Sequence, residues 1–301
     1  MRRIMTQADT LEKIMQKTNA APLQAGSAAH VRNNVGPRVI SIASGKGGVG
    51  KTNLAANLGF ALTKKDKRVL ILDADLNLAN VDVLVGLTPQ FNLHHVFKGE
   101  KTLTEVMTEG PGGMQILPGS SGIMELASLT ESQKLYFLEE MEEFSKKIDI
   151  LIIDTAAGIN DNVVYFNLAA QERIIILTPE PTSLTDAYAL IKVLSGRYDV
   201  KKFRIVINQA SSEKEAISVF KKLSLVCDKF LDSLSLDFLG HILSDQKLKK
   251  AVRSQRLVTE MYPEADSSKM FLSISEQLLN EEPDFTDDGN IKFFWQKIFD
   301  R

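Results

Sequence analysis

A glycine-rich segment between an apolar strand and a helix constrains this chain more than any other feature. The run VISIA, residues 39–43, leads directly into SGKGGVGKT, and a stretch with helical periodicity follows. The pattern G-x-x-x-x-G-K-[ST] is met there by Gly45, Gly50, Lys51 and Thr52. A strand that passes through such a loop into a helix is the arrangement of a phosphate-binding loop (P-loop) in an α/β protein.

The residue types of this loop suit the phosphates of a nucleotide. Glycines let backbone N–H groups point inward around phosphate oxygens, and the helix N-terminus adds a favourable dipole. We expect Lys51 to meet the β- and γ-phosphates and the Thr52 hydroxyl to ligate Mg²⁺. The nucleotide contacts expected from the loop are Gly45, Gly47, Gly48, Val49, Gly50, Lys51 and Thr52.

Strand and helix patterns alternate along most of the chain. From Arg38 to about Leu279, short β-branched runs are separated by amphipathic segments. Near-continuous apolar runs are typical of strands that are buried on both faces. The alternation predicts a three-layer α/β fold, with a mostly parallel sheet and helices on both of its faces. The expected strands are VISIA, VLILD, MQILPG, IDILIID, RIIILT, FRIVIN and FLGHI.

Composition narrows the function classes. With 36 Lys and Arg against 38 Asp and Glu, the 301-residue chain has a formal net charge of −2, which excludes a polycation that binds nucleic acid by bulk charge. The single cysteine, Cys227, cannot form an intramolecular disulfide or a four-cysteine metal site, so we expect a reducing, cytoplasmic compartment. No run of about eighteen apolar residues occurs, so we expect no membrane-spanning helix.

The two ends differ from the body between them. Residues 1–37 combine a short predicted helix with an Ala-, Asn-, Gly- and Pro-rich stretch that is typical of a flexible linker. Residues 281–301 begin with EEPDFTDD, an acidic linker, and end in an aromatic-rich segment. We therefore predict three parts: an N-terminal helix and linker over 1–37, a folded domain over 38–280, and a linker with a C-terminal helix over 281–301.

The last segment, GNIKFFWQKIFDR, has an apolar face flanked by basic residues. An i, i+3, i+4, i+7 spacing places Ile291, Phe294, Trp295 and Ile298 on one side of a helix, with Phe299 beside them. Lysine and arginine next to such a face suit lipid headgroups. We predict an amphipathic helix that binds a membrane, with docking on the chain's own core as the alternative.

Acidic and amide side chains follow three of the expected strands. Asp73 and Asp75 come after VLIL, Asp154 ends IDILIID, and Asn208 ends FRIVIN. Ligands of open parallel sheets bind outside the carboxyl ends of the strands, so these side chains are expected near the phosphates. Asp154 has the position of a carboxylate that holds Mg²⁺ through water, whereas Asp73 and Asp75 could instead cap the following turn. Gly158 follows in a loop whose backbone could approach the γ-phosphate and sense its loss.

A second lysine indicates which group the loop resembles. Lys46 follows the first glycine, and the resulting K-G-G-V-G-K-T resembles the deviant Walker A ATPases of the MinD/ParA group. The order of the motifs over residues 38–279 resembles that group as well. The resemblance implies that ATP and Mg²⁺ are the ligands and that ATP joins two subunits into a dimer. Lys46 would then reach the phosphates of the other subunit, and the catalytic residues would be Lys46, Lys51 and Asp75.

The same resemblance assigns roles at the strand ends. It implies that Asp75 orients the attacking water, that Asp73 lies in the outer shell of the metal and that Asn208 recognises the base. The metal-binding residues would be Thr52 directly and Asp154 through water.

The N-terminal segment indicates one branch of this group. TQADTLE resembles the N-terminal motif with which the flagellar-number ATPases (FlhG, also called FleN or YlxH) stimulate a partner SRP-type GTPase, FlhF. Gln7, Ala8 and Leu11 agree with that motif, whereas Thr6 and Glu12 replace its acidic and basic positions. The resemblance implies an ATP-hydrolysing regulator of flagellar number or placement that cycles between the cytoplasm and the inner membrane. Its implied partners are a second copy of itself, an FlhF-like GTPase, anionic inner-membrane lipid, and flagellar switch-complex or transcriptional regulator proteins.

Other functions stay open on the sequence alone. A partition ATPase that binds DNA would use surface bases, and one helical stretch carries Lys247, Lys249, Lys250, Arg253 and Arg256, although we expect no nucleic-acid partner. A MinD-type division-site regulator and a nucleotide-dependent binding module without turnover would share the same motifs. The iron–sulfur reductases of the group are excluded, because they need bridging cysteines.

Overall fold

The computed structural model describes residues 36–75, 80–118, 130–231 and 233–281. The chain divides into two units after Asn34, and all of the described residues belong to the second unit. The predicted partner-activating residues Gln7, Ala8 and Leu11 and the predicted membrane helix over 291–299 lie outside the described residues. They stay predictions, as do the two boundaries between the three predicted parts.

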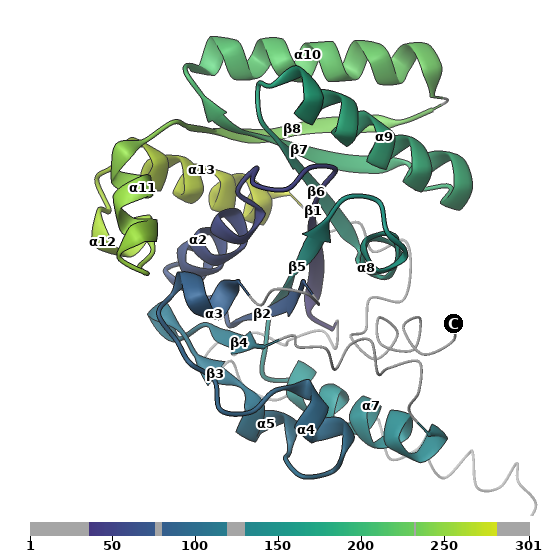
Figure 1. Ribbon diagram of the computed structural model, residues 1–301, viewed down its shortest axis with the longest axis vertical. Helices are drawn as coiled ribbons and strands as arrows, with labels where there is room; N and C mark the ends of the chain where they lie inside the picture. The colour runs from purple at the N-terminus through teal and green to yellow at the C-terminus, as the bar shows by residue number, and fades with distance from the viewer. Residues whose placement is uncertain (1–35, 76–79, 119–129, 232, 282–301) are drawn as a thin grey trace, which may run out of the picture. The chain divides into compact units, whose positions relative to one another are not determined.

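One eight-stranded sheet forms the centre of the described unit (Figure 1). Its strand order is β3-β4-β2-β5-β1-β6-β7-β8. The short β3 pairs antiparallel with β4, and all of the other neighbouring pairs are parallel. The mostly parallel sheet predicted from the sequence is therefore confirmed. The strands are β1 Arg38–Ser44, β2 Val69–Ala74, β3 Thr108–Glu109, β4 Gln115–Leu117, β5 Ile150–Ala157, β6 Glu172–Leu177, β7 Lys202–Ala210 and β8 Ser235–Leu243.

Helices cover both faces of the sheet and complete the three predicted layers (Figure 1). The helices of the described residues are α2 Lys51–Thr63, α3 Val81–Leu84, α4 Leu93–Phe97, α5 Leu103–Val106, α7 Glu131–Ser145, α8 Asp161–Ala169, α9 Pro181–Tyr198, α10 Glu213–Phe230, α11 Gln246–Arg253, α12 Val258–Met261 and α13 Asp266–Asn280, with a 3₁₀ turn at Pro111–Gly113. Because side chains alternate along a strand, Ile40 and Ile42 of β1 pack with α2, α12 and α13. Val39 packs with α7, and Ala43 packs with α8 and α9 on the opposite face.

The carboxyl ends of the central strands lie at one edge of the sheet. β2 and β5 are neighbours, in a register that places Asp73 opposite Asp154. On the other side of β5, β1 ends at Ser44 and continues into the glycine-rich loop. Beyond β6, β7 reaches the same edge at Asn208. The parallel direction of the strands therefore gathers the predicted site residues from segments that are far apart in the sequence.

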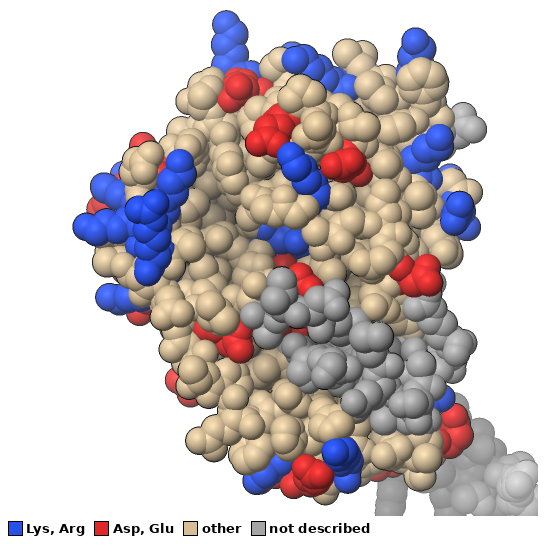
Figure 2. Space-filling view, viewed as in Figure 1, with Lys and Arg blue, Asp and Glu red and all other residues tan. Residues whose placement is uncertain are grey.

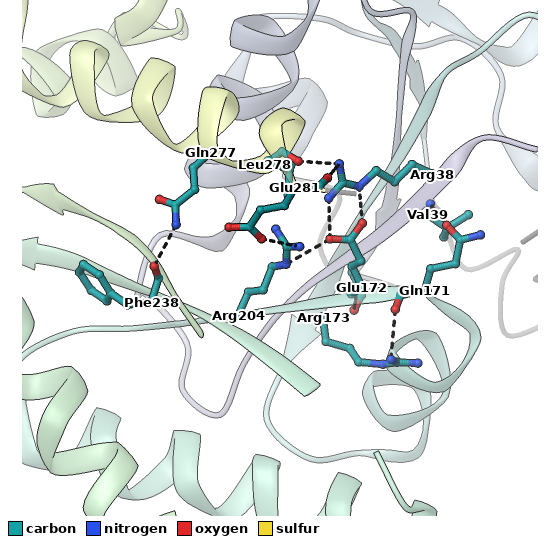
Figure 3. A network of polar contacts seen from close by, with 11 residues as sticks. Arg38, Val39, Gln171, Glu172, Arg173, Arg204, Phe238, Gln277, Leu278 and Glu281 are labelled. Carbon is teal, nitrogen blue, oxygen red and sulfur yellow. Dashed lines mark hydrogen bonds and ion pairs between the residues drawn. The ribbon is translucent and has the colours of Figure 1, made fainter. Parts of the chain in front are cut away.

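A buried ionic network joins the amino ends of β1, β6 and β7 to the end of α13 (Figure 3). The Arg38 guanidinium, at the start of β1, donates to both carboxylate oxygens of Glu172 and, over 2.6 Å, to the Leu278 carbonyl. Arg204 of β7 lies 3.2 Å from Glu172 through Nε and 2.8 Å from Glu281 through Nη2. Arg38 and Glu172 are buried, so each charge depends on its partners in the network. The network fixes where α13 ends, at the edge of the sheet opposite the glycine-rich loop.

No helix in the described part of the chain is long and apolar enough to cross a membrane.

Candidate nucleotide site

The glycine-rich loop, Gly45 to Gly50, has a backbone that needs its glycines at specific places. Gly48 and Gly50 have φ angles of +77° and +96°, in the left-handed region that favours glycine. At Gly45 the constraint is space, because a Cβ there would lie 2.2 Å from the backbone oxygen of Asp186 in α9. The loop therefore passes close against the first turns of α9, as its sequence pattern allows.

Two ionisable side chains, Lys51 and Asp154, lie next to the loop. Lys51 begins α2 and is buried, and both carboxylate oxygens of Asp154 are buried without a hydrogen-bond partner among the described residues. Burial, with a smaller contribution from Asp73, raises the pKa of Asp154 to about 7, while the Lys51 charge opposes the rise. The Thr52 hydroxyl is near enough to lower this pKa as well, although it makes no well-formed hydrogen bond to the carboxylate.

These donor atoms fit a hydrated Mg²⁺ bound with a nucleotide. Mg²⁺ prefers oxygen ligands, keeps several of its waters and uses only one or two protein carboxylates. The unpartnered Asp154 oxygens could accept hydrogen bonds from metal-bound water, and the Thr52 hydroxyl begins the same helix as Lys51. The geometry is thus compatible with the predicted metal roles of Thr52 and Asp154, which stay predictions.

Asp73 has a structural partner set of its own. One carboxylate oxygen accepts from the backbone N–H groups of Asn80, over 2.8 Å, and Val81, over 3.1 Å, and the other accepts from Asp75 N–H over 3.1 Å. Burial nevertheless raises the pKa of Asp73 to about 6, since desolvation outweighs the three hydrogen bonds. Asp73 therefore caps the start of α3, the alternative that the sequence left open, and its role in the metal's outer shell stays a prediction.

Asp75, the predicted water-orienting residue, is half-buried directly after β2. The hydrogen bond from its backbone to Asp73 fixes the chain at this point. The capping of α3 and the position of Asp75 are thus set by the same buried carboxylate.

Lys46 lies at the rim of the loop and contacts the start of α9. Its Nζ is 2.6 Å from a Glu180 carboxylate oxygen and 3.0 Å from the Thr182 hydroxyl. The side chain is 37% exposed, so this ion pair is open to solvent. Sequence reasoning singled out Lys46 and missed Glu180 and Thr182; the signal that could have found them is the segment TPEPTSLTD directly after β6.

Gly158 lies beside the base of the loop. It follows β5 with a φ angle of +97°, and its N–H donates to the Ser44 carbonyl over 2.9 Å. Among the described residues other than its two chain neighbours, none has an atom within 4 Å of the position that a Cβ would occupy there. The segment thus has the space that a γ-phosphate sensor needs, and that role stays a prediction.

Asn208 contacts the loop itself. Its Nδ2 donates to the Val49 carbonyl over 2.6 Å, and its Oδ1 accepts from the Gln209 N–H over 2.8 Å. The family resemblance implied base recognition for this side chain, and nothing in the sequence predicted the contact with the loop. Base recognition stays a prediction, to be fulfilled by the amide's remaining N–H and lone pair.

The family of the chain follows from its match to known proteins. A family model described as ParA, an NUBPL iron-transfer P-loop NTPase, matches residues 36–279. The chain belongs to this ParA family of P-loop NTPases. With its P-loop and buried carboxylates in place, it is an ATPase of this family, as predicted. Iron transfer through bridging cysteines does not fit this member, because Cys227 is its single cysteine and is buried in α10.

Two curated relatives of this ParA-family ATPase have the names of the flagellar-number branch, FleN and YlxH. Antiactivator FleN of Pseudomonas aeruginosa is 42% identical over 261 residues, which cover 87% of this chain and 93% of FleN. Flagellum site-determining protein YlxH of Helicobacter pylori is 35% identical over 231 residues, which cover 77% of this chain and 78% of YlxH. The resemblance to the flagellar-number branch is therefore confirmed.

Among solved structures, the MinD cell division protein of Aquifex aeolicus superimposes with a TM-score of 0.62 at 25% identity. The match covers 83% of this chain and 100% of that one. The MinD-like fold that the sequence predicted is confirmed.

The buried Asp154 carboxylate should reduce stability in the absence of ligands. Because the folded state raises its pKa, Asp154 costs little stability below about pH 4, and the cost grows as the pH rises toward 7. Asp154→Asn, a neutral side chain of the same shape, should therefore unfold with a free energy about 1–3 kcal/mol higher than the wild type at pH 8. Urea unfolding in EDTA without nucleotide, repeated from pH 5 to pH 8, measures the difference.

The matched control is the exposed Asp228 of α10, whose replacement by Asn should change the unfolding free energy by less than about 0.5 kcal/mol at every pH. An Asp154→Asn variant that is less stable than the wild type at pH 8 would contradict the view that burial of this incompletely compensated charge costs stability.

Proposed function

We propose that the chain is an ATP-dependent dimerising regulator of flagellar number or placement. The relatives FleN and YlxH support the flagellar assignment. The observation that carries the ATP-dependent mechanism is the pair of lysines on one P-loop. Lys51 is buried below the loop and Lys46 is accessible at its rim, so one can serve the subunit's own nucleotide and the other a second subunit's.

Binding of Mg-ATP would use the loop and the strand ends together. The loop amides and Lys51 would hold the β- and γ-phosphates, and the Thr52 hydroxyl and Asp154, the latter through water, would hold Mg²⁺. Bound Mg²⁺ would supply charge neutralisation at the phosphates. Asn208 would contact the adenine edge.

Hydrolysis would depend on the residues that follow β2 and β5. Asp75 would orient the attacking water, and Lys46 of the second subunit would stabilise the charge that develops on the transferred phosphate. Gly158 would report loss of the γ-phosphate by a movement of its loop. In this scheme ATP closes the dimer and hydrolysis opens it.

The two ends of the chain would connect this cycle to partners. We infer that the apolar face of Ile291, Phe294, Trp295, Ile298 and Phe299 binds anionic lipid at the inner membrane. A dimer presents two such helices, and effective concentration strengthens binding by two weak anchors. At the other end, Gln7 on a short helix with Ala8 and Leu11 would stimulate an FlhF-like GTPase, where an added glutamine can orient water.

A second candidate function rests on α11. Its outward face carries Lys247, Lys249, Lys250 and Arg253, all of them exposed, while Leu248 and Val252 pack against the core. Figure 2 shows Lys and Arg side chains gathered where α11 lies. Such a basic face would suit DNA in a partition ATPase. Tight DNA binding that weakens steeply with salt would favour this candidate over the membrane.

The lysine assignment predicts different defects for two variants. Lys46→Ala should keep ATP binding through Lys51 but weaken the ATP-dependent dimer about 100-fold, since two symmetric contacts of roughly 1.4 kcal/mol each are lost. Asp75→Ala should keep the dimer and slow phosphate release about 100-fold or more. Analytical ultracentrifugation with Mg-ATP and a phosphate-release assay measure both.

Lys67→Ala, an exposed lysine after α2, is the control and should match the wild type in both assays. A Lys46→Ala dimer of unchanged stability would contradict action in trans. A wild-type chain that dimerises with ATP but releases no phosphate, even with lipid and partner present, would favour a binding module without turnover.

Removing each end of the chain should abolish a different activity. Deleting residues 290–301 should abolish ATP-dependent sedimentation with phosphatidylglycerol liposomes and leave stimulation of the FlhF-like GTPase intact. Deleting residues 1–15 should do the reverse, so each truncated chain is the control for the other. Liposome binding that survives the C-terminal deletion, or stimulation that survives the N-terminal one, would contradict the corresponding role.

A further inference from the structure

We infer that Asn208 is a positioning residue for the P-loop, which holds the Val49 carbonyl and so sets the affinity of the loop for phosphate. The inference rests on the proposed binding of nucleotide at this loop and goes beyond base recognition. Asn208 lies near the carboxyl end of β7, whereas Val49 lies 159 residues earlier in the chain, so the contact joins two segments that only the fold brings together.

The contact is a short hydrogen bond inside the protein. Asn208 Nδ2 lies 2.6 Å from the Val49 oxygen, and Asn208 and Val49 are 4% and 2% exposed. The carbonyl belongs to the residue before Gly50, whose own N–H and that of Lys51 are expected to face phosphate. A buried carbonyl without a donor is costly, so the amide of Asn208 stabilises this backbone conformation.

The backbone of β7 fixes the direction of the amide. Gln209 has a φ angle of +59°, and the register between β7 and β8 shifts between Asn208 and Ala210. This bulge brings the Gln209 N–H to 2.8 Å from Asn208 Oδ1. These two partners permit only one orientation of the Asn208 amide. Its oxygen must face the Gln209 N–H, and its NH₂ group must face the Val49 carbonyl. Hydrogen bonds within the protein therefore direct Nδ2 at the loop.

The loop is shaped to receive this amide. A Cβ on Gly50 would lie 2.3 Å from Asn208 Nδ2, a distance that excludes any other residue while the amide keeps its place. Gly50 also has a φ angle of +96°. Gly50 is therefore needed for two reasons: the left-handed backbone of the turn and the space that the Asn208 amide occupies.

One side chain would consequently join the base to the phosphates. The amide uses one N–H for Val49 and one lone pair for Gln209, which leaves one of each for a base edge. Loss of the amide would relax the loop and weaken phosphate binding even when no base is present. Base recognition alone predicts no such effect.

The test uses inorganic tripolyphosphate with Mg²⁺, a ligand that has no base. In calorimetric titrations of the full chain, Asn208→Ala should bind Mg-tripolyphosphate about tenfold more weakly than the wild type, the equivalent of one lost hydrogen bond. The control is Asn57→Ala in α2. Asn57 is buried and makes hydrogen bonds to Asn53 and Thr259 but none to the loop, so its loss should change tripolyphosphate affinity less than twofold.

If Asn208→Ala does not fold by circular dichroism, Asn208→Ser gives the same comparison, because its hydroxyl is one bond too short to replace the amide. Unchanged tripolyphosphate affinity in a folded Asn208 variant, with only ATP affinity reduced, would overturn the inference and leave base recognition. A wild type that binds ATP but not tripolyphosphate would overturn it as well. A wild type that binds neither ligand would contradict the proposed function itself.

Discussion

The carboxylate of Asp154 is the constraint on which the site depends. It lies near the carboxyl end of β5 in the middle of the sheet, buried and without a hydrogen-bond partner among the described residues, and the charge of Lys51 offsets only part of the cost of its burial. A protein keeps such a group when a ligand completes its surroundings, because an uncompensated buried charge costs stability. Mg²⁺ and its waters are the ligands that suit an acidic oxygen beside a phosphate-binding loop. The buried carboxylate thus lowers the stability of the nucleotide-free protein and strengthens its binding of Mg²⁺ with a nucleotide.

The P-loop owes its shape to neighbours on three elements. α9 approaches Gly45 at its backbone, the segment after β5 donates from Gly158 to Ser44, and β7 donates from Asn208 to Val49. Strand order explains this convergence, since β5 and β6 flank β1 and β7 lies one strand further. A local movement at any of these three contacts would reach the phosphate-binding amides. The conformation of the loop thus depends on contacts with its neighbours in the fold and not on its own sequence alone.

Features of the fold and site that depend on residues close together in the sequence could be predicted, and those that depend on distant residues could not. The P-loop, the strand ends and the three layers follow from local patterns, such as Gly45 to Thr52 and the apolar run before Asp154, and the structure agrees with them. The contacts of Lys46 with Glu180 and of Asn208 with Val49 span more than a hundred residues and depend on strand order and on a bulge at Gln209. On the sequence Asp73 could have been a cap or a metal neighbour; its capping bonds depend on the position of α3, which the sequence does not give, and its role near the metal stays a prediction.

The central claim is that a Mg²⁺–nucleotide complex completes this site, and thermal unfolding of the wild-type chain tests it most directly. A ligand that binds the folded state raises stability by RT ln(1 + [L]/Kd). The unfolding midpoint at pH 8 should rise more with ATP and Mg²⁺ than with the same ATP in EDTA, because only the former supplies a cation at Asp154. Equal midpoints with and without Mg²⁺, or no shift with ATP at all, would contradict this account of the site.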